Sequence, residues 1–194
     1  MKEFFDVAVI GGGAAGLCAA VRLKQTASCS VVILEKLSRV GKKLSVTGNG
    51  QCNITNSRIS RARYHGEHPE FTDYALDKYD TAFTEGFFGE LGVLFTYDNQ
   101  GRVYPYSLQA SSVSDSLRFA ADSLGVTTYT DSKVLGIEKV GNRFELATDE
   151  TYSSEENLFK IAKLYNAKFY KKIKFLIFLH FLSKYSLFFC QIGV

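Results

Sequence analysis

The first 35 residues alternate apolar runs with small and polar residues in the order strand, helix, strand. Asp6–Ile10 is apolar and ends at three consecutive glycines, which is typical of a strand buried in a parallel sheet. Ala14–Gln25 is rich in Ala and Leu and predicts a helix, and the β-branched run Ser30–Glu35 predicts a second strand. This order indicates an α/β fold with a parallel sheet.

The pattern beyond residue 40 predicts a second group of elements. Residues 40–56 are punctuated by glycine and predict a loop. Phe71–Leu91 has helical spacing, with Phe83, Phe87, Phe88 and Leu91 on one side. The other expected elements are a hairpin of Val93–Tyr97 and Arg102–Tyr106 around Asp98–Gly101, a helix over Ser112–Leu124 capped by Ser112 or Ser114, and strands at Val126–Tyr129, Lys133–Val140 and Arg143–Thr148.

Composition changes near residue 153. Residues 1–150 contain 15 of the 16 glycines and both prolines, whereas residues 151–194 contain no Pro, Asp or Arg. We therefore expect an N-terminal domain over 1–153 and a basic, aromatic-rich tail over 154–194. The tail is dominated by residue types that A/T-rich codons encode, so a shifted reading frame is the favoured interpretation. A natural basic helix and a membrane segment at 173–194 are the alternatives, although two lysines and a histidine interrupt that apolar stretch.

Charge and cysteine content limit the classes of protein to which this chain can belong. The net charge of +3 comes from the tail, because residues 1–150 carry 16 Lys/Arg against 18 Asp/Glu. The main body therefore gives no reason to expect nucleic-acid binding. The four cysteines show no CxxC pair and no metal-ligand spacing, which is typical of thiols in a reducing compartment. The chain opens directly on a strand, so we expect no signal peptide and a cytoplasmic protein.

A dinucleotide fingerprint joins the first strand to the first helix. The motif Gly-x-Gly-x-x-Gly is formed by Gly11, Gly13 and Gly16. These glycines permit a tight turn, a close approach of pyrophosphate to the backbone and close packing of the helix. Glu35 ends the second strand, 19 residues beyond Gly16, where a carboxylate accepts hydrogen bonds from ribose hydroxyls and disfavours a 2′-phosphate. The glycines alone are a weak signal, but the strand, helix and acidic residue together favour a nucleotide site.

A second glycine-rich loop follows, over Gly41–Asn56. Its glycines and amide side chains can approach a flat heterocycle or its phosphates, and its lysines can neutralise pyrophosphate charge. This loop, with a fingerprint so near the N-terminus, favours FAD over NAD as the nucleotide.

These motifs together make the chain similar to the BaiN/YhiN-type flavoproteins, also described as aminoacetone-oxidase-family or NAD(P)/FAD-dependent oxidoreductases. The resemblance rests on GGGAAG, the acidic strand end, GKKLxxTGNGxCNxTN and the later stretch GRVYPYS, and it covers about residues 4–150. It implies a Rossmann-like FAD-binding domain of the two-dinucleotide-binding flavoprotein type, here truncated. It also implies that NAD(P)H reduces the flavin, which then reduces an electron-poor double bond in a small molecule such as a bile-acid-like steroid.

The resemblance also implies roles for individual residues. Glu35 would hold the ribose, Lys36 would lie near the adenosine, and Val134 would pair with adenine through its backbone. Gln51 stands where the family usually has Arg, and the family's Ala-Thr-Gly-Gly strand, substrate domain and closing segment are not found after Ser153. The pyrophosphate residues would be Gly11, Gly13, Ala14, Ala15 and Gly16, and the flavin-side residues Lys43, Gly48, Asn49, Gly50, Cys52 and Asn53.

Other chemically suggestive residues have ordinary interpretations. Cys52 is better explained as a small packing residue than as a redox centre, and His65 and His68 as a surface turn than as metal ligands. Tyr104 and Tyr106 are expected on an edge strand. The favoured function is an FAD-binding oxidoreductase that is impaired in this chain. A truncated product without turnover and an NAD-dependent dehydrogenase remain the alternatives.

Overall fold

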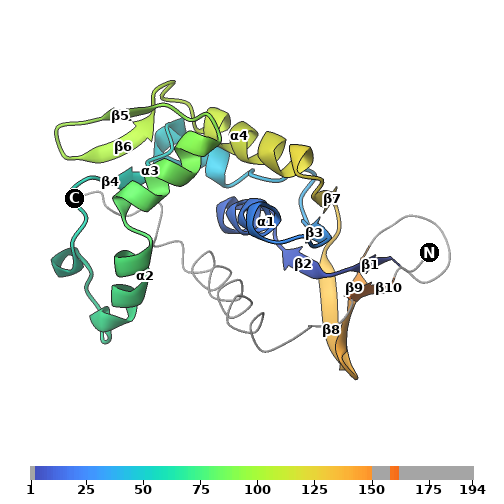
Figure 1. Ribbon diagram of the computed structural model, residues 1–194. Coiled ribbons are helices and arrows are strands. Elements are labelled where there is room, and N and C mark those ends of the chain that lie inside the picture. Colours follow the sequence, from blue (N-terminus) through green and yellow to red (C-terminus); the bar gives the residue numbers. More distant parts are fainter. Residues whose placement is uncertain (1–2, 150–157, 162–194) are drawn as a thin grey trace. The chain divides into compact units, whose positions relative to one another are not determined.

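The computed structural model describes residues 3–149 and 158–161 and shows a mixed α/β protein (Figure 1). Its contacts divide these residues into two compact units. The first unit contains residues 3–43, 117–149 and 158–161, and the second contains residues 44–116. Each unit is described by itself.

The first unit is built around a three-stranded parallel sheet in the order β2-β3-β7. Strand β2 spans Val7–Ile10, β3 spans Val31–Leu34 and β7 spans Thr127–Tyr129. All four residues of β3 are buried, as expected of a central parallel strand covered on both faces. The expected βαβ order is thus confirmed, and the helix between β2 and β3 is α1, Ala14–Thr26.

A second sheet of the first unit has the strand order β1-β10-β9-β8. Leu146 packs with Val32 and Leu34, so this sheet covers one face of the parallel sheet. Because side chains alternate along a strand, Val31 and Ile33 point to the opposite face, where α1 contacts β3. The four strands are β1 Phe4–Phe5, β8 Val134–Val140, β9 Arg143–Thr148 and β10 Leu158–Ile161.

Two of these strands were not anticipated. Strand β1 pairs in parallel with β10, and β10 pairs antiparallel with β9. Strand β10 lies in the segment that the composition assigns to the tail. The domain boundary at residue 153 stays a prediction, and the membrane segment considered at 173–194 lies outside the described residues. In the described part of the chain, no helix is long and apolar enough to cross a membrane. The cytoplasmic location also stays a prediction.

The second unit has an antiparallel sheet in the order β4-β6-β5. Strand β4 is Thr55–Asn56, β5 is Phe95–Tyr97 and β6 is Arg102–Pro105. The expected hairpin is confirmed, but β6 is the central strand, because it pairs with both β4 and β5. The expectation of an edge strand here was therefore wrong, and Tyr106 lies just beyond the strand.

The helices of the second unit correct two further expectations. The stretch Phe71–Leu91 is not one helix: a 3₁₀ turn at Pro69–Thr72 leads into α2, Asp73–Lys78, and then α3, Thr81–Glu90. Tyr79 has non-helical backbone angles, which end α2. The Asp80 side chain caps α3 by accepting a hydrogen bond from the Phe83 N–H at 2.8 Å.

Helix α4 spans Ala110–Ser123 and begins earlier than expected. Ser112 and Ser114 therefore lie inside it and are not its N-cap. The Ser112 hydroxyl donates to the Gln109 carbonyl at 2.7 Å, and the Ser114 hydroxyl donates to the Ser111 carbonyl at 2.9 Å. The second unit also contains two 3₁₀ segments, at Leu44–Gly50 and Arg61–Arg63.

Candidate functional site

The glycine turn between β2 and α1 is tightly folded onto its neighbours. Gly11 has φ +96°, a conformation that favours glycine, and its N–H donates to the Leu34 carbonyl at 2.8 Å. A Cβ at Gly16 would lie 1.9 Å from the Gly11 oxygen and 3.2 Å from a Val9 methyl. Gly16 is therefore required for the helix to approach the turn, which is the role that the sequence motif predicts.

Gly12 is a residue of this turn that sequence reasoning missed. Its N–H donates to Glu35 Oε2 at 2.7 Å, and its carbonyl accepts from the Gly41 N–H at 2.7 Å. A Cβ at Gly12 would lie 2.3 Å from a Val40 methyl. The signal in the sequence was the third consecutive glycine, but only the contact with Val40 explains it.

The Glu35 carboxylate is fixed by backbone groups on both sides. It is buried, with 8% of its surface exposed. Oε2 accepts from Gly12, and Oε1 accepts from the Leu37 N–H at 2.9 Å. Each oxygen keeps a second lone pair, so the carboxylate is held in one orientation and still has acceptor capacity for a ribose hydroxyl.

The first turn of α1 has donors to offer a ligand. Gly13 is the N-cap and supplies no side-chain hydrogen bond. The N–H groups of Ala14, Ala15 and Gly16 have no acceptor within the helix, whose first i→i−4 bond runs from Leu17 to Gly13. A Cβ at Gly11 or Gly13 would meet no atom within 4 Å, so the space over the turn is open. This arrangement fits a pyrophosphate.

The segment after β7 continues the site beyond Glu35. The Glu35 N–H donates to the Tyr129 carbonyl at 2.8 Å, and the Ser132 N–H donates to the Glu35 carbonyl at 2.9 Å. Val134, two residues after Ser132, is half-buried at the start of β8, and Lys36 is exposed. The residues predicted for pyrophosphate, ribose and adenine all lie in the first unit, with Lys43 at its boundary, and their roles stay a prediction.

The second glycine-rich loop lies in the second unit and has an unusual backbone. The segment Leu44–Gly50 has non-helical angles at its centre. Four residues in this loop have positive φ: Gly48 at +56°, Asn49 at +53°, Gly50 at +83° and Cys52 at +59°. Such angles are costly for Asn and Cys, and clusters of them are typical of ligand-binding loops.

One buried polar atom in this loop points to a ligand. Asn53 Oδ1 is buried and has no hydrogen-bond partner in the described residues. Leaving such an atom unsatisfied costs free energy, and a ligand donor would remove that cost. Cys52 is 1% exposed beside it, which is consistent with its expected packing role. The loop therefore fits a polar heterocycle such as a flavin.

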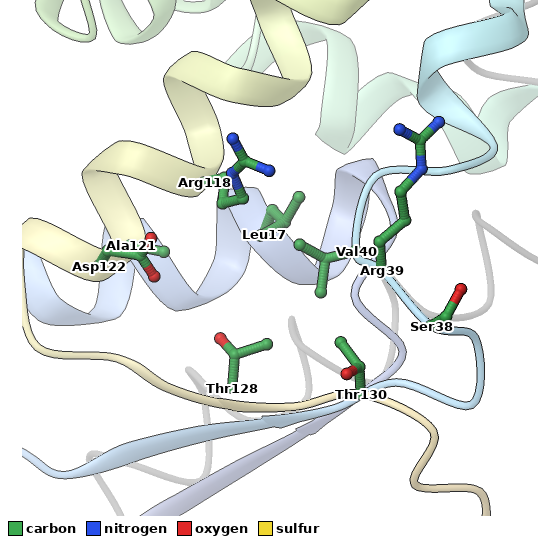
Figure 2. Close-up of a pocket in the computed structure, with 9 residues that line it drawn as sticks. All are labelled: Leu17, Ser38, Arg39, Val40, Arg118, Ala121, Asp122, Thr128 and Thr130. Carbon is green, nitrogen blue, oxygen red and sulfur yellow. The ribbon is translucent and has the colours of Figure 1, made fainter.

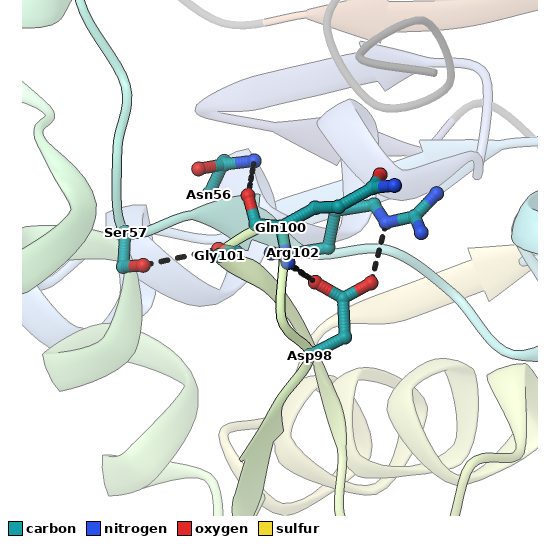
Figure 3. A network of polar contacts seen from close by, with 6 residues as sticks. All are labelled: Asn56, Ser57, Asp98, Gln100, Gly101 and Arg102. Atoms are coloured by element: carbon teal, nitrogen blue, oxygen red, sulfur yellow. Dashed lines mark hydrogen bonds and ion pairs between the residues drawn. The ribbon is translucent and has the colours of Figure 1, made fainter. Parts of the chain in front are cut away.

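A hydrogen-bond network fixes the hairpin that carries Tyr104 and Pro105 (Figure 3). Asp98 accepts from the Gln100 N–H and the Arg102 N–H at 2.9 Å each, and from Arg102 Nε at 2.6 Å. Partial burial acts to raise the pKa of Asp98, but the hydrogen bonds from Arg102 and Gln100 outweigh it and hold that pKa below its ordinary value.

Strand β4 closes the same network from the other side. Asn56 is 1% exposed, and its Nδ2 donates to the Gln100 carbonyl at 3.3 Å, while the Ser57 hydroxyl donates to the Gly101 carbonyl at 3.1 Å. The Thr81 hydroxyl donates to the Asn56 carbonyl at 2.8 Å. Gly101 has φ +80°, and a Cβ there would lie 2.8 Å from Ser57 Oγ. The end of the second glycine-rich loop is thus anchored to the hairpin.

The other candidate residues show no site of their own. His68 Nδ1 lies 3.1 Å from a Glu70 oxygen on the surface. Residues 3–149 and 158–161 contain no group of His, Cys, Asp or Glu that could hold a metal ion. Within the same residues, Cys18, Cys29 and Cys52 form no disulfide.

Comparison with known proteins shows the family and the fold of this chain. A family model described as the HI0933-like protein Rossmann domain matches residues 5–162. A 3-dehydro-bile acid Δ(4,6)-reductase of Clostridium scindens is 38% identical over 144 residues, which are 74% of this chain and 35% of that protein. A ribosomal RNA dihydrouridine synthase of Haemophilus influenzae is 27% identical, covering 81% of this chain and 40% of that protein. The chain thus spans about two fifths or less of the length of these relatives.

Solved structures with this fold include flavoenzyme-type oxidoreductases. A 3-ketosteroid Δ4-(5α)-dehydrogenase from Rhodococcus jostii, in complex with 4-androstene-3,17-dione, matches 82% of this chain and 44% of its own with a TM-score of 0.54 and 14% identity. The p-nitrophenol 4-monooxygenase PnpA from Pseudomonas putida matches 83% of this chain and 40% of its own, with a TM-score of 0.51 and 16% identity. At these identities the likeness concerns the fold. The chain has a Rossmann-type FAD-binding fold and belongs to the HI0933-like family, a family of FAD-binding oxidoreductases.

Proposed function

We propose that this chain binds FAD and forms the FAD-binding part of a reductase that acts on an electron-poor carbon–carbon double bond. The main support is the uncapped first turn of α1 beside the fixed Glu35 carboxylate. In this proposal the N–H groups of Ala14, Ala15 and Gly16 donate to the pyrophosphate. Glu35 accepts from the ribose, and the Val134 backbone pairs with adenine.

The flavin side of the site is assigned to the second loop. Lys43 would lie by the phosphates, and Asn53 would bond to the ring system, since its Oδ1 is buried without a partner. The positive-φ residues Gly48, Asn49 and Gly50 would direct backbone groups toward the same ligand. Cys52 is buried in the same loop and is assigned a packing role in this proposal.

The chemistry itself would come from the cofactor. When bound, FAD would supply the hydride chemistry between a reduced nicotinamide nucleotide and the acceptor, and the protein would orient and polarise the reacting groups. NAD(P)H as the reductant is part of this proposal. The name of the Clostridium scindens relative describes a reduction of double bonds in a 3-dehydro bile acid, which favours a steroid with a double bond conjugated to a ketone. The whole activity is proposed for the longer proteins of the family, and we expect impaired turnover in this chain alone.

A pair of glycine variants tests FAD binding. Gly13→Ala adds a methyl group into open space at a residue whose φ of −77° suits alanine, so the fold should be kept, with a stability loss of about 1 kcal/mol or less. The same methyl group would occupy the place of the pyrophosphate and should weaken FAD binding at least tenfold, measured by quenching of flavin fluorescence. Gly89→Ala, on α3 with no atom within 4 Å, is the matched control and should not change FAD binding. A wild-type protein that takes up no FAD, or a Gly13→Ala variant that binds it equally well, would contradict the proposal.

A second candidate acceptor is a uridine in RNA. Two relatives are ribosomal RNA dihydrouridine synthases by name, one of them 30% identical and from Escherichia coli. Residues 36–66 contain seven Lys/Arg and no Asp or Glu, although Arg61 is paired with Asp73 and Asp77. The expectation of no nucleic-acid partner therefore stays a prediction. Binding of a uridine-containing RNA that weakens steeply with salt would favour this candidate, whereas a shift of the flavin spectrum by a steroid enone would favour the first.

A further inference from the structure

A pocket outside the proposed FAD site lies on the helix face of the parallel sheet (Figure 2). Its volume is about 220 Å³. It is bounded by α1, the first-unit end of α4, strand β7 and the loop after β3. The lining residues are Leu17, Ser38, Arg39, Val40, Arg118, Ala121, Asp122, Thr128 and Thr130.

Strand β7 separates this pocket from the layer that carries Val134. Tyr129 packs in the cluster of Val32 and Leu34, against the second sheet. Because side chains alternate along a strand, Thr128 points to the opposite face, into the pocket, and Thr130, just after β7, lines the same pocket. The Glu35 N–H donates to the Tyr129 carbonyl, and the Asp131 N–H donates to the Leu37 carbonyl. These bonds join the ends of β3 and β7, so the backbone lies between the pocket and the second sheet. The pocket is therefore a place distinct from the adenine side of the nucleotide site.

The polar groups of the pocket suit an anion with hydroxyl groups. The guanidinium groups of Arg39 and Arg118 lie on one side of the pocket, and Thr128 and Thr130 lie on the other (Figure 2). Arginine binds phosphate oxygens through two parallel N–H groups. The hydroxyls of Thr128 and Thr130 form no hydrogen bond with the described part of the chain. Asp122 is the acidic residue of the lining, which therefore holds two cationic side chains and one carboxylate.

The size of the pocket limits the ligand. Sites for drug-sized ligands span roughly 300–1,000 Å³, and this pocket has room for about seven waters at roughly 30 Å³ each. A fragment of one sugar ring and one phosphate is of this scale. The phosphate would meet Arg39 and Arg118, and the sugar hydroxyls would meet the threonines and Asp122.

We propose that the pocket bounded by Arg39, Arg118, Thr128 and Thr130 binds a phosphorylated ribose. Two sources share this chemistry: a free sugar phosphate, and the 2′-phosphoadenosine end of NADPH. The pocket is independent of the FAD proposal, because none of its lining residues is assigned to FAD.

The test is a titration of the full chain with ribose 5-phosphate and, separately, with adenosine 2′,5′-bisphosphate, followed by amide chemical shifts in NMR. Each titration is run without FAD and again with excess FAD. We expect saturable shifts at Thr128 and Thr130 that FAD does not change. Tighter binding of the bisphosphate identifies the nucleotide as the source, and equal or weaker binding identifies a free sugar phosphate. Absence of saturable shifts with both probes, or displacement of the probes by FAD, overturns the proposal.

Variants separate this site from general attraction of anions. Arg39→Gln and Arg118→Gln should each weaken binding at least tenfold, which equals about 1.4 kcal/mol. Thr128→Val keeps the shape of the side chain and should weaken binding a few-fold. Arg22→Gln is the matched control, because Arg22 is exposed on α1 of the same unit and does not line the pocket. Equal weakening in Arg22→Gln and the pocket variants overturns the proposal, and far-UV circular dichroism confirms that all variants are folded.

Discussion

The two glycine-rich regions of this protein differ in backbone conformation and in hydrogen bonding. In the turn at residues 11–16, glycine occupies each position where the backbone angle or the space demands it, and Glu35 ties the turn to β3. In the loop at residues 44–53, Asn49 and Cys52 hold positive φ without being glycine, and Asn53 Oδ1 is buried without a partner. The first region has a backbone without strained non-glycine residues and keeps open N–H groups at the start of α1, whereas the second carries strain and a buried acceptor without a partner.

This difference leads to an expectation about how FAD acts on each region. In the turn, the hydrogen bonds of Glu35 to Gly12 and Leu37 are in place without a ligand, so we expect the proposed ADP side to be pre-formed. The loop has a cost that contacts with a ligand can offset, because strained residues persist where surrounding structure or a ligand over-determines them. We therefore expect FAD to stabilise the second unit more than the first. Hydrogen exchange with and without FAD measures this, and equal protection of both units would contradict it.

The largest effect is expected at Gly16. In Gly16→Ala the added Cβ would lie 1.9 Å from the Gly11 carbonyl oxygen, which is backbone and cannot rotate away. The turn and α1 must separate, at a cost of about 3 kcal/mol or more in the free energy of unfolding. Thermal unfolding should show a large loss of stability together with loss of FAD binding. A variant with wild-type stability would mean that the turn is looser than described.

The next effect is expected at Glu35. In Glu35→Gln one of the two oxygens becomes an NH₂ group, which cannot accept the N–H of Gly12 or Leu37. One buried donor is left unsatisfied, so the free energy of unfolding should fall by about 1–3 kcal/mol. FAD affinity should fall as well, because the turn and the ribose contact are both disturbed. Chemical denaturation and an FAD titration measure the two losses, and unchanged values would show that the carboxylate is dispensable.

A smaller effect of opposite sign is expected in the second loop. Asn49→Gly relieves positive φ and should raise the stability of the ligand-free protein by about 1 kcal/mol or less. It should also weaken FAD binding, because the loop loses its fixed shape and the Asn side chain. Leu108→Gly is the control, since Leu108 has φ +53° in the same unit outside the loop. Leu108→Gly should raise stability without changing FAD binding. If both variants changed the FAD affinity to a similar degree, the loop would have no special role in binding.

The smallest effect concerns pH and the Asp98 network. The pKa of Asp98 is lowered in the folded protein, so its contribution to stability is present above the pKa of the unfolded chain and is lost as pH falls through the folded pKa. Asp98→Asn keeps an acceptor for the backbone N–H groups and lacks this titration. The stability difference between wild type and variant should therefore be present at neutral pH and should shrink below about pH 4. A difference that does not depend on pH would contradict this account.

Local patterns were enough to predict the strands and helices around the nucleotide site. The βαβ order follows from apolar runs of the right length, and the hairpin at residues 95–105 follows from a polar turn that ends in glycine. The break between α2 and α3 had a local signal in Asp80, a residue type that favours N-caps, but the aromatic residues on either side continue a helical spacing. The position of β6 at the centre of its sheet had no local signal, because pairing with β4 joins residues more than 40 positions apart.

The sequence by itself determined the family, the parallel sheet and the glycines that turn the chain toward a dinucleotide. These depend on residues close together in the chain, where backbone angles and side-chain period act directly. The tertiary structure alone decided why Gly12 must be glycine, which backbone groups hold Glu35, and that Thr128 and Thr130 share a pocket with Arg39 and Arg118. These depend on distances between segments far apart in the chain, which are set only when the layers pack.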